Sequence, residues 1–178
     1  MKKKLLWIIM TAFLLQGCRE KQKEEAINII TEYRCEISDV VFFLDGLWEE
    51  NIKEESNTDL EIELSACHIE TGSEILVCYD ELEDKKGGNL FRLDDYLLEI
   101  IEKLENSKEY NYTLSEVSDI ILYDESYKAF QAIADSPSSK HYFYVREKDK
   151  KIISIVVTVY EEDNINEIIQ LGKKINGK

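Results

Sequence analysis

Residues 152–160 read IISIVVTVY, a run rich in β-branched residues. Ile155 to Val157 would place apolar side chains on both faces of a strand, so this stretch is predicted to lie at the centre of a sheet that is covered on both sides. The segment His141 to Arg146 precedes it and is joined to it by the polar turn Glu147 to Lys151. The two segments are predicted to form a long antiparallel hairpin.

A second hairpin is predicted earlier in the chain. Apolar and polar residues alternate from Leu60, which is typical of a half-buried strand, and Ile75 to Tyr79 reads as the returning strand after the turn Thr71-Gly72-Ser73. Further β-branched and aromatic segments are expected to be strands at Tyr112 to Val117, Ile120 to Tyr123 and Ala129 to Ala134.

Three segments are predicted to be helical. Steps alternating between four and three residues indicate a long amphipathic N-terminal helix, through Ala26, Ile30, Tyr33, Ile37, Val40, Leu44 and Leu47. Apolar spacing also predicts a helix over Leu93 to Leu104 and a C-terminal helix over Ile165 to Ile175. The predicted fold class is α+β, an antiparallel sheet flanked by helices with the long amphipathic helix at the N-terminus.

The first residues have the pattern of an export signal. Lys2, Lys3 and Lys4 precede the apolar run Leu5 to Leu15, which is too short to span a bilayer. The sequence Leu15-Gln16-Gly17-Cys18 resembles the lipobox of bacterial lipoproteins. The resemblance implies cleavage between Gly17 and Cys18 and a lipid anchor on the Cys18 thiol. We therefore predict a signal peptide at residues 1–17, a lipidated cysteine and tether at 18–25, and a single domain at 26–178.

From about residue 60 to residue 176, the order of elements resembles that of Mog1/PsbP-like domains. The matching features are the hairpin around Thr71-Gly72-Ser73, the helix Asp94 to Asn106, the strand Lys128 to Ala134, the hairpin Tyr142 to Tyr160 and the helix Asn164 to Ile175. The long first helix departs from this family, whose members usually open on a strand and a tryptophan-containing turn. The resemblance implies an accessory or binding role and no shared catalytic residues.

The net charge of the mature chain restricts the kinds of partner that it could bind. The leader holds three of the 22 basic residues and none of the 37 acidic ones, which leaves the mature chain with a formal net charge of −18. Such a field disfavours nucleic acid and favours a basic protein partner, although acidic charge also simply keeps an exported protein in solution. Arg19 follows the cysteine, where an aspartate would signal inner-membrane retention, so outer-membrane sorting is implied in a Gram-negative host.

The sequence leaves open whether two of the remaining cysteines form a disulfide. Cys67 and Cys78 face each other if Gly72-Ser73 is the hairpin loop, and they are offset if Thr71-Gly72 is the loop instead. Cys35 is expected to be a small core residue, because only Arg34 beside it could activate the thiol.

No motif of a metal site or catalytic site occurs, and no cofactor is expected. His68 is expected to be an ordinary strand residue, because adjacent strand residues such as Cys67 point to opposite faces. The carboxylates around Asp80 to Asp84 and Glu161 to Asp163 lack the spacing of a calcium loop.

Aromatic residues concentrate in the segment that precedes the central strand. Tyr142, Tyr144 and Arg146 would share one strand face, which is either a partner surface or buried under a helix. The leading hypothesis is a non-enzymatic, lipid-anchored envelope lipoprotein that binds another protein. The alternative is an immunity lipoprotein that neutralises a secreted basic antibacterial toxin.

Overall fold

The central strand lies where the sequence predicts it. We analysed a computed structural model that describes residues 30–51, 61–81, 92–160 and 164–175. Strand β10 (Lys151–Tyr160) pairs antiparallel with β9 (Ser138–Lys148) on one side and with β5 (Glu74–Glu81) on the other. Its residues from Ile152 to Val159 are all buried, so both faces are covered and the prediction of a covered central strand is confirmed.

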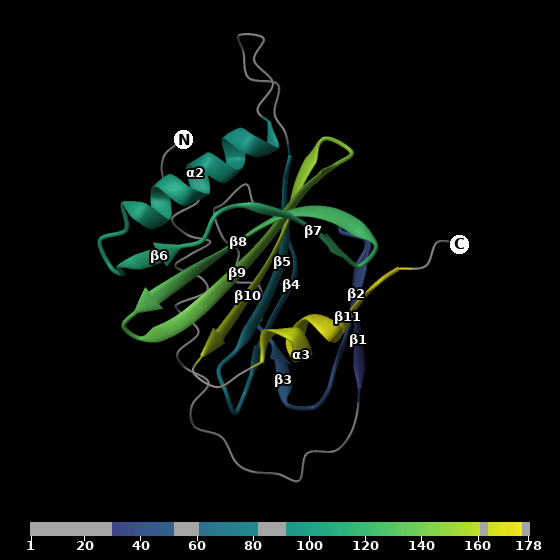
Figure 1. Ribbon diagram of the computed structural model, residues 1–178. Coiled ribbons are helices and arrows are strands. Elements are labelled where there is room, and N and C mark those ends of the chain that lie inside the picture. Colours follow the sequence, from purple (N-terminus) through teal and green to yellow (C-terminus); the bar gives the residue numbers. More distant parts are fainter. Residues whose placement is uncertain (1–29, 52–60, 82–91, 161–163, 176–178) are drawn as a thin grey trace.

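Eight antiparallel strands form the large sheet (Figure 1). Their order is β3-β4-β5-β10-β9-β8-β6, and β7 also pairs with β8. The remaining strands are β3 (Trp48–Glu50), β4 (Glu61–His68), β6 (Tyr112–Leu114), β7 (Ser118–Leu122) and β8 (Glu125–Asp135). Both predicted hairpins are present, and Gly72 at the β4–β5 turn has a φ of +78°, a conformation that glycine adopts without steric cost.

Helix α2 (Leu93–Glu105) covers one face of this sheet (Figure 1). The backbone N–H of Arg92 donates to the Asp95 carboxylate at 3.0 Å, which satisfies a group at the start of the helix. The helix belongs to an apolar core formed by Tyr96, Leu97, Ile100, Leu104, Phe130, Ala132, Phe143, Val145, Ile152 and Val156. This helix was predicted correctly.

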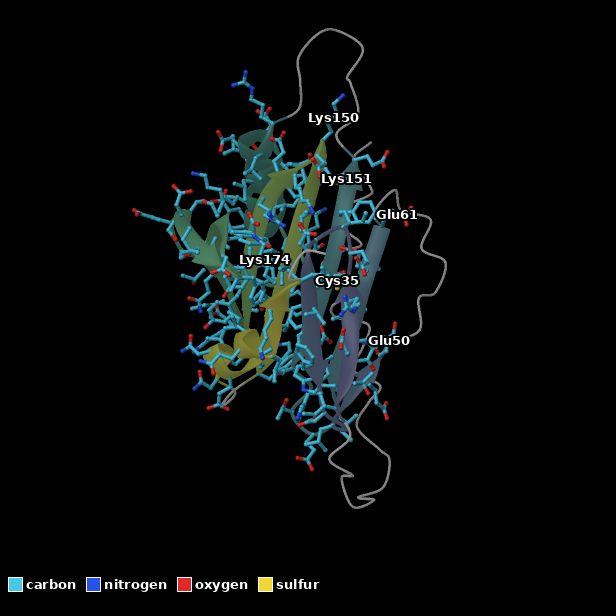
Figure 2. The ribbon with its side chains drawn as sticks, turned by 90° about the vertical axis from the view of Figure 1, so that its right-hand side faces the viewer. Cys35, Glu50, Glu61, Lys150, Lys151 and Lys174 are labelled. Carbon is cyan, nitrogen blue, oxygen red and sulfur yellow. The ribbon has the colours of Figure 1, made fainter. Side chains whose placement is uncertain are left out.

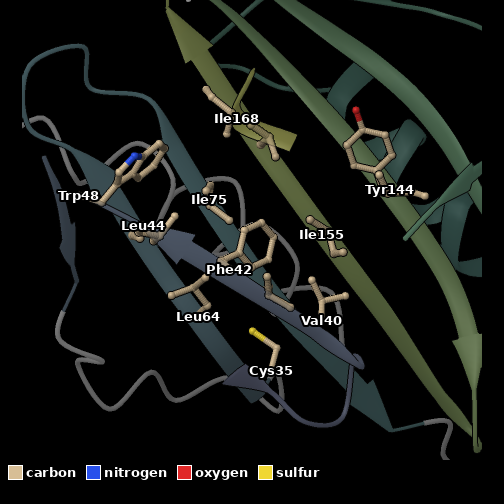
Figure 3. Close-up of a cluster of buried hydrophobic side chains, with 14 of the residues drawn as sticks. Cys35, Val40, Phe42, Leu44, Trp48, Leu64, Ile75, Tyr144, Ile155 and Ile168 are labelled. Carbon is tan, nitrogen blue, oxygen red and sulfur yellow. The ribbon is translucent and has the colours of Figure 1, made fainter. Parts of the chain in front are cut away.

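A small sheet and a short helix cover the opposite face. Strands β1 (Thr31–Cys35), β2 (Val40–Leu44) and β11 (Gly172–Lys174) pair in the order β1-β2-β11, and α3 (Ile165–Gln170) precedes β11. Figure 3 shows the side chains of this second core between the two sheets, including Phe42, Leu64, Ile75 and Ile155.

The prediction of a long N-terminal helix is wrong. The predicted fold class, which included this helix, is wrong as well. Residues from Thr31 to Leu44 form a two-stranded hairpin, and the described chain is a mostly antiparallel β-structure with only α2 and α3 as helices. Val40, Phe42 and Leu44 are buried in the core, which is the alternation of a strand. The predicted C-terminal helix also stops early, because Gly172 to Lys174 pair with β2.

Candidate functional site

A row of polar side chains crosses the face of the large sheet that α2 covers, near the C-terminal end of β10. Thr158 is the direct cross-strand partner of Glu74 on β5 and of His141 on β9. Direct partners in an antiparallel pair project from the same face, so the three side chains lie side by side. All three are buried.

His141 is held by hydroxyl groups. Its Nδ1 lies 3.0 Å from Thr158 Oγ1, and its Nε2 lies 3.0 Å from Ser139 Oγ. Burial lowers the pKa of the imidazole to about 4, so the ring is neutral at pH 7. Ser139 is also buried, so this network orders the interior and does not expose a nucleophile.

Glu74 is the more unusual member of the row. Its exposed fraction is 6%, and burial raises the pKa of its carboxyl to about 8. Burial is the one resolved cause of the shift, so no cation or hydrogen-bond donor within the described residues offsets it. The carboxyl is therefore mostly protonated at pH 7.

Three tyrosines stand beside this row. The ring centroids of Tyr110 and Tyr112 are 6.1 Å apart, and the Tyr112 ring meets that of His141 edge-on at 5.8 Å. Burial, followed by the charge of Glu74, raises the pKa of Tyr160 to about 12, which places this phenol near the carboxyl. We refer to Glu74, Tyr110, Tyr112, His141, Thr158 and Tyr160 as the tyrosine–Glu74 cluster.

The sequence did not predict this cluster. Its members come from β5, β10, β9, β6 and the segment that enters β6, and the sheet order makes direct neighbours only of β5, β10 and β9. One signal was available, since Glu74 directly follows the turn Thr71-Gly72-Ser73 and precedes the apolar residues of β5.

A second polar group joins the two sheets on the opposite face. Arg146 Nη1 lies 3.1 Å from Glu125 Oε2, and its Nη2 donates to the carbonyl oxygen of Ser38 at 2.9 Å. Glu125 Oε1 also accepts from Lys174 Nζ at 2.5 Å, and this bond is the main reason that the pKa of Glu125 is lowered. Figure 2 faces the small sheet, with Lys174 and Cys35 labelled.

The turn between β1 and β2 is anchored in the same region. The Glu63 carboxylate accepts from the backbone N–H of Ile37 at 2.7 Å and of Ser38 at 3.0 Å. Lys148 forms an ion pair with Asp39 and donates to the carbonyl oxygen of Ile37 at 3.1 Å. These contacts hold the small sheet on the large one.

The residues predicted as a partner surface do not form one. Tyr144 and Arg146 are buried, with exposed fractions of 7% and 6%, and Tyr142 is half-buried against the core. They share a strand face, as predicted, but the small sheet and α3 cover this face of the large sheet (Figure 1). The alternative that these side chains are buried is therefore correct, although the small sheet and not a helix alone provides the cover.

The structure does not bring Cys67 and Cys78 together. Cys67 pairs with Glu74 and Cys78 pairs with Ile62. Four residues of β5 separate the two positions, roughly 13 Å along the strand, and a disulfide needs Cα atoms within about 7 Å. Gly17 and Cys18, the predicted cleavage and lipidation site, lie outside the described residues.

Two other candidate residues, His68 and Cys35, pack against side chains of the fold. His68 meets the Trp48 ring edge-on at 5.2 Å, and Cys35 is fully buried in the core. Among the described residues, no group of three His, Cys, Asp or Glu side chains could hold a metal ion. Within the same ranges, no helix has the length and apolar character needed to cross a membrane.

The fold has counterparts among solved structures. The solution structure of cyanobacterial PsbP (CyanoP) from Synechocystis sp. PCC 6803 is similar, with a TM-score of 0.59 and 11% identity over 89% of this chain and 99% of that one. The Ran-binding protein Mog1p of Saccharomyces cerevisiae matches with a TM-score of 0.43 and 8% identity, over 84% of this chain and 97% of its own. No family model and no curated protein matches the chain. The fold is therefore PsbP-like, as the order of predicted elements implied.

Proposed function

We propose that the protein is a lipid-anchored envelope lipoprotein that works by binding another protein and not by catalysis. The observation that carries the proposal is the lipobox Leu15-Gln16-Gly17-Cys18 ahead of a PsbP-like fold. Two or three acyl chains on Cys18 would anchor the chain stably, because each buried CH₂ contributes about 0.8 kcal/mol.

The chemistry of the described polar groups supports a binding role. Ser139 and His141 engage each other inside the sheet, and Arg146 and Glu125 are engaged between the two sheets. These groups stabilise the fold.

An immunity lipoprotein is the second candidate, favoured by one observation. The net charge of −18 predicted for the mature chain would steer a basic toxin toward the protein. Under this proposal a toxin gene lies beside the gene for this chain, whereas an accessory protein needs no such neighbour.

Crosslinking in living host cells, followed by mass spectrometry, tests the binding role. We expect a defined protein to be captured by the wild-type chain and lost when Cys18→Ala releases the chain from the membrane. A single basic secreted enzyme would identify an immunity protein, and a resident envelope protein would identify an accessory one. Capture that is the same for both chains would contradict an anchored role.

A further inference from the structure

We propose that strand β1 is a dimerisation edge, at which a second copy of this chain adds its own β1 antiparallel about a two-fold axis at Tyr33. The small sheets of the two copies would then form one continuous sheet. The inference rests on the proposed membrane anchor, which concentrates the chains. It deepens the proposed binding role by naming a second copy of the chain as a partner.

The first observation is that one side of β1 is unpaired in the described chain. The order of the small sheet is β1-β2-β11, so β1 pairs with β2 and has no described strand on its other side. Thr31, Glu32 and Arg34 are exposed along this strand. An edge strand with free main-chain groups is a template for a further strand.

The hydrogen bonds of β2 show which main-chain groups of β1 point outward. The backbone N–H of Phe43 donates to the carbonyl oxygen of Leu171 at 2.8 Å, on the side of β2 where β11 lies. Phe43 is the direct partner of Glu32, and direct partners in an antiparallel pair exchange either two hydrogen bonds or none. The N–H and C=O groups of Glu32 therefore point away from β2, and by alternation so do those of Arg34.

The side chains of this edge are complementary to a copy of themselves. Strand residues alternate between faces, so Glu32 and Arg34 project from the outer face of the small sheet, whereas Tyr33 packs against the core. A two-fold axis at Tyr33 places each Glu32 opposite the Arg34 of the second copy, in a hydrogen-bonded pair. Within one copy, Arg34 Nε already lies 2.5 Å from Glu32 Oε1. In the dimer each carboxylate would therefore have a guanidinium group on either side.

Tyr33 is suited to the centre of this ladder. It would face its own copy in a pair without hydrogen bonds, in which the Cα atoms are about 4.5 Å apart. Tyr33 is half-buried in one copy, so the second ring would cover surface that the fold leaves exposed. Aromatic residues that face each other across two strands stabilise the pairing.

The other described edge strands lack this complementarity. β3 carries Glu49 and Glu50, and β11 carries Lys173 and Lys174, so a second copy would bring like charges together at either edge. β6 and β7 contain no cation. Among the described edges, β1 alone presents one charge of each sign on the same face.

The predicted anchor is compatible with this arrangement. Thr31 lies 13 positions after Cys18, and an extended chain of that length spans about 45 Å. The two Thr31 residues of the dimer would be roughly 14 Å apart along the ladder, so both anchors can reach one membrane. Five residues make a short interface, so we expect association among anchored chains, where the local concentration is high, and a monomer in dilute solution.

The test is disulfide trapping of the full-length protein in host cells. Tyr33→Cys places two thiols opposite each other, within the Cα distance of about 4.4–6.8 Å that a disulfide requires. After oxidation with diamide, we expect a disulfide-linked dimer in the membrane fraction on a non-reducing gel. Ile121→Cys, at a position 73% exposed on β7, is the control for random collision and should give little dimer. Cys35, Cys67 and Cys78 are buried, so their background should be low.

Charge variants separate this edge from other contacts. In the Tyr33→Cys background, Glu32→Arg makes all four charges of the ladder positive and Arg34→Glu makes them all negative, so each should reduce the trapped dimer at least about fivefold. The two variants expressed together, with tags of different size, should restore a mixed dimer, because opposite charges then face each other. Glu105→Arg, an exposed residue of α2, is the matched control and should leave the yield unchanged.

A second readout covers a loss of folding in Tyr33→Cys, which circular dichroism would detect. Formaldehyde crosslinking of two differently tagged copies, followed by affinity recovery of one tag, repeats the charge comparison without the added cysteine. An anchored chain that gives no dimer, equal trapping through Ile121→Cys, or a mixed pair that is no more abundant than the pairs of either variant alone would overturn the proposal.

The anchor and the edge can fail separately. A chain that is absent from the membrane fraction would refute the proposed anchor, and with it this inference. An anchored monomer would refute the dimerisation edge alone, and the capture of another protein by the wild-type chain would be unaffected.

Discussion

Arg146 is the residue on which the contact between the two sheets depends most directly. Its guanidinium bonds Glu125 and the Ser38 carbonyl oxygen, and its side chain is 7% exposed. We predict that Arg146→Met lowers the free energy of unfolding by about 1–3 kcal/mol, because it removes one of the two cations that pair with Glu125 and leaves the carbonyl oxygen of the buried Ser38 without this donor. Urea denaturation measures this loss.

Arg34→Met is the matched control for that prediction. Arg34 forms an ion pair with Glu32, but their side chains are 55% and 43% exposed. Exposed pairs contribute little, so the change should stay within about 0.5 kcal/mol. Equal losses in both variants would mean that Arg146 has no special role between the sheets.

Glu74 predicts an unusual dependence of stability on pH. Its pKa is raised from the ordinary 4.5 to about 8, so between these values the folded state holds a proton that the unfolded state has released. Stability therefore falls as pH rises through this window, by at most about 1.4 kcal/mol per pH unit. His141, whose pKa is lowered from 6.5 to about 4, acts in the opposite direction below pH 6.5.

The effect of Glu74 should be separable above pH 6.5. Denaturation of the wild type is expected to show a decline in the free energy of unfolding from pH 6.5 to pH 8, and Glu74→Gln should remove that decline. A wild-type protein whose stability is constant over this range would contradict the burial of an uncompensated carboxyl.

At the scale of elements, strand β2 is the feature that decides between a sheet and a helix at the N-terminus. Phe42 is fully buried between the two sheets, whereas it lay off the apolar stripe of the predicted helix. Phe42→Ala should lower the free energy of unfolding by about 3–5 kcal/mol. Phe43→Ala, on the other strand face and only half-buried, should cost clearly less. Similar losses, measured by denaturation, would argue against the strand.

The sequence predicted strongly patterned elements and missed the ambiguous one. Both hairpins and α2 followed from alternation, turn residues and helical spacing. The segment from Thr31 to Leu44 also places apolar residues at steps of three and four, so its spacing satisfied a helix. The β-branched and aromatic run Val40 to Leu44 favoured a strand and was the better guide. Spacing alone could not decide, because the strand is buried against a sheet that the local sequence does not show.

At the scale of the whole molecule, β10 is shared by two cores. Val156 faces the α2 core, and Ile155 and Val157 face the core under the small sheet. Val156→Asp should therefore unfold the protein, because an unpaired charge there costs several kcal/mol to bury. Ile121→Asp, at a position 73% exposed, should leave the melting temperature nearly unchanged. A folded Val156→Asp protein, seen by circular dichroism, would contradict this account.

The tyrosine–Glu74 cluster belongs to this scale as well. No local pattern reveals it, since Glu74, His141 and Thr158 meet only through the pairing of β5, β10 and β9. The surface predicted at Tyr142 to Arg146 failed for the same reason, because the small sheet that covers it comes from the two ends of the described chain.

The anchor is the central claim, and the intact mass of the protein purified from host membranes tests it most directly. We predict a chain that begins at Cys18, lacks residues 1–17 and carries the added mass of a diacylglycerol, with or without a further acyl chain. A chain that retains residues 1–17, or that begins elsewhere with an unmodified Cys18, would contradict the account.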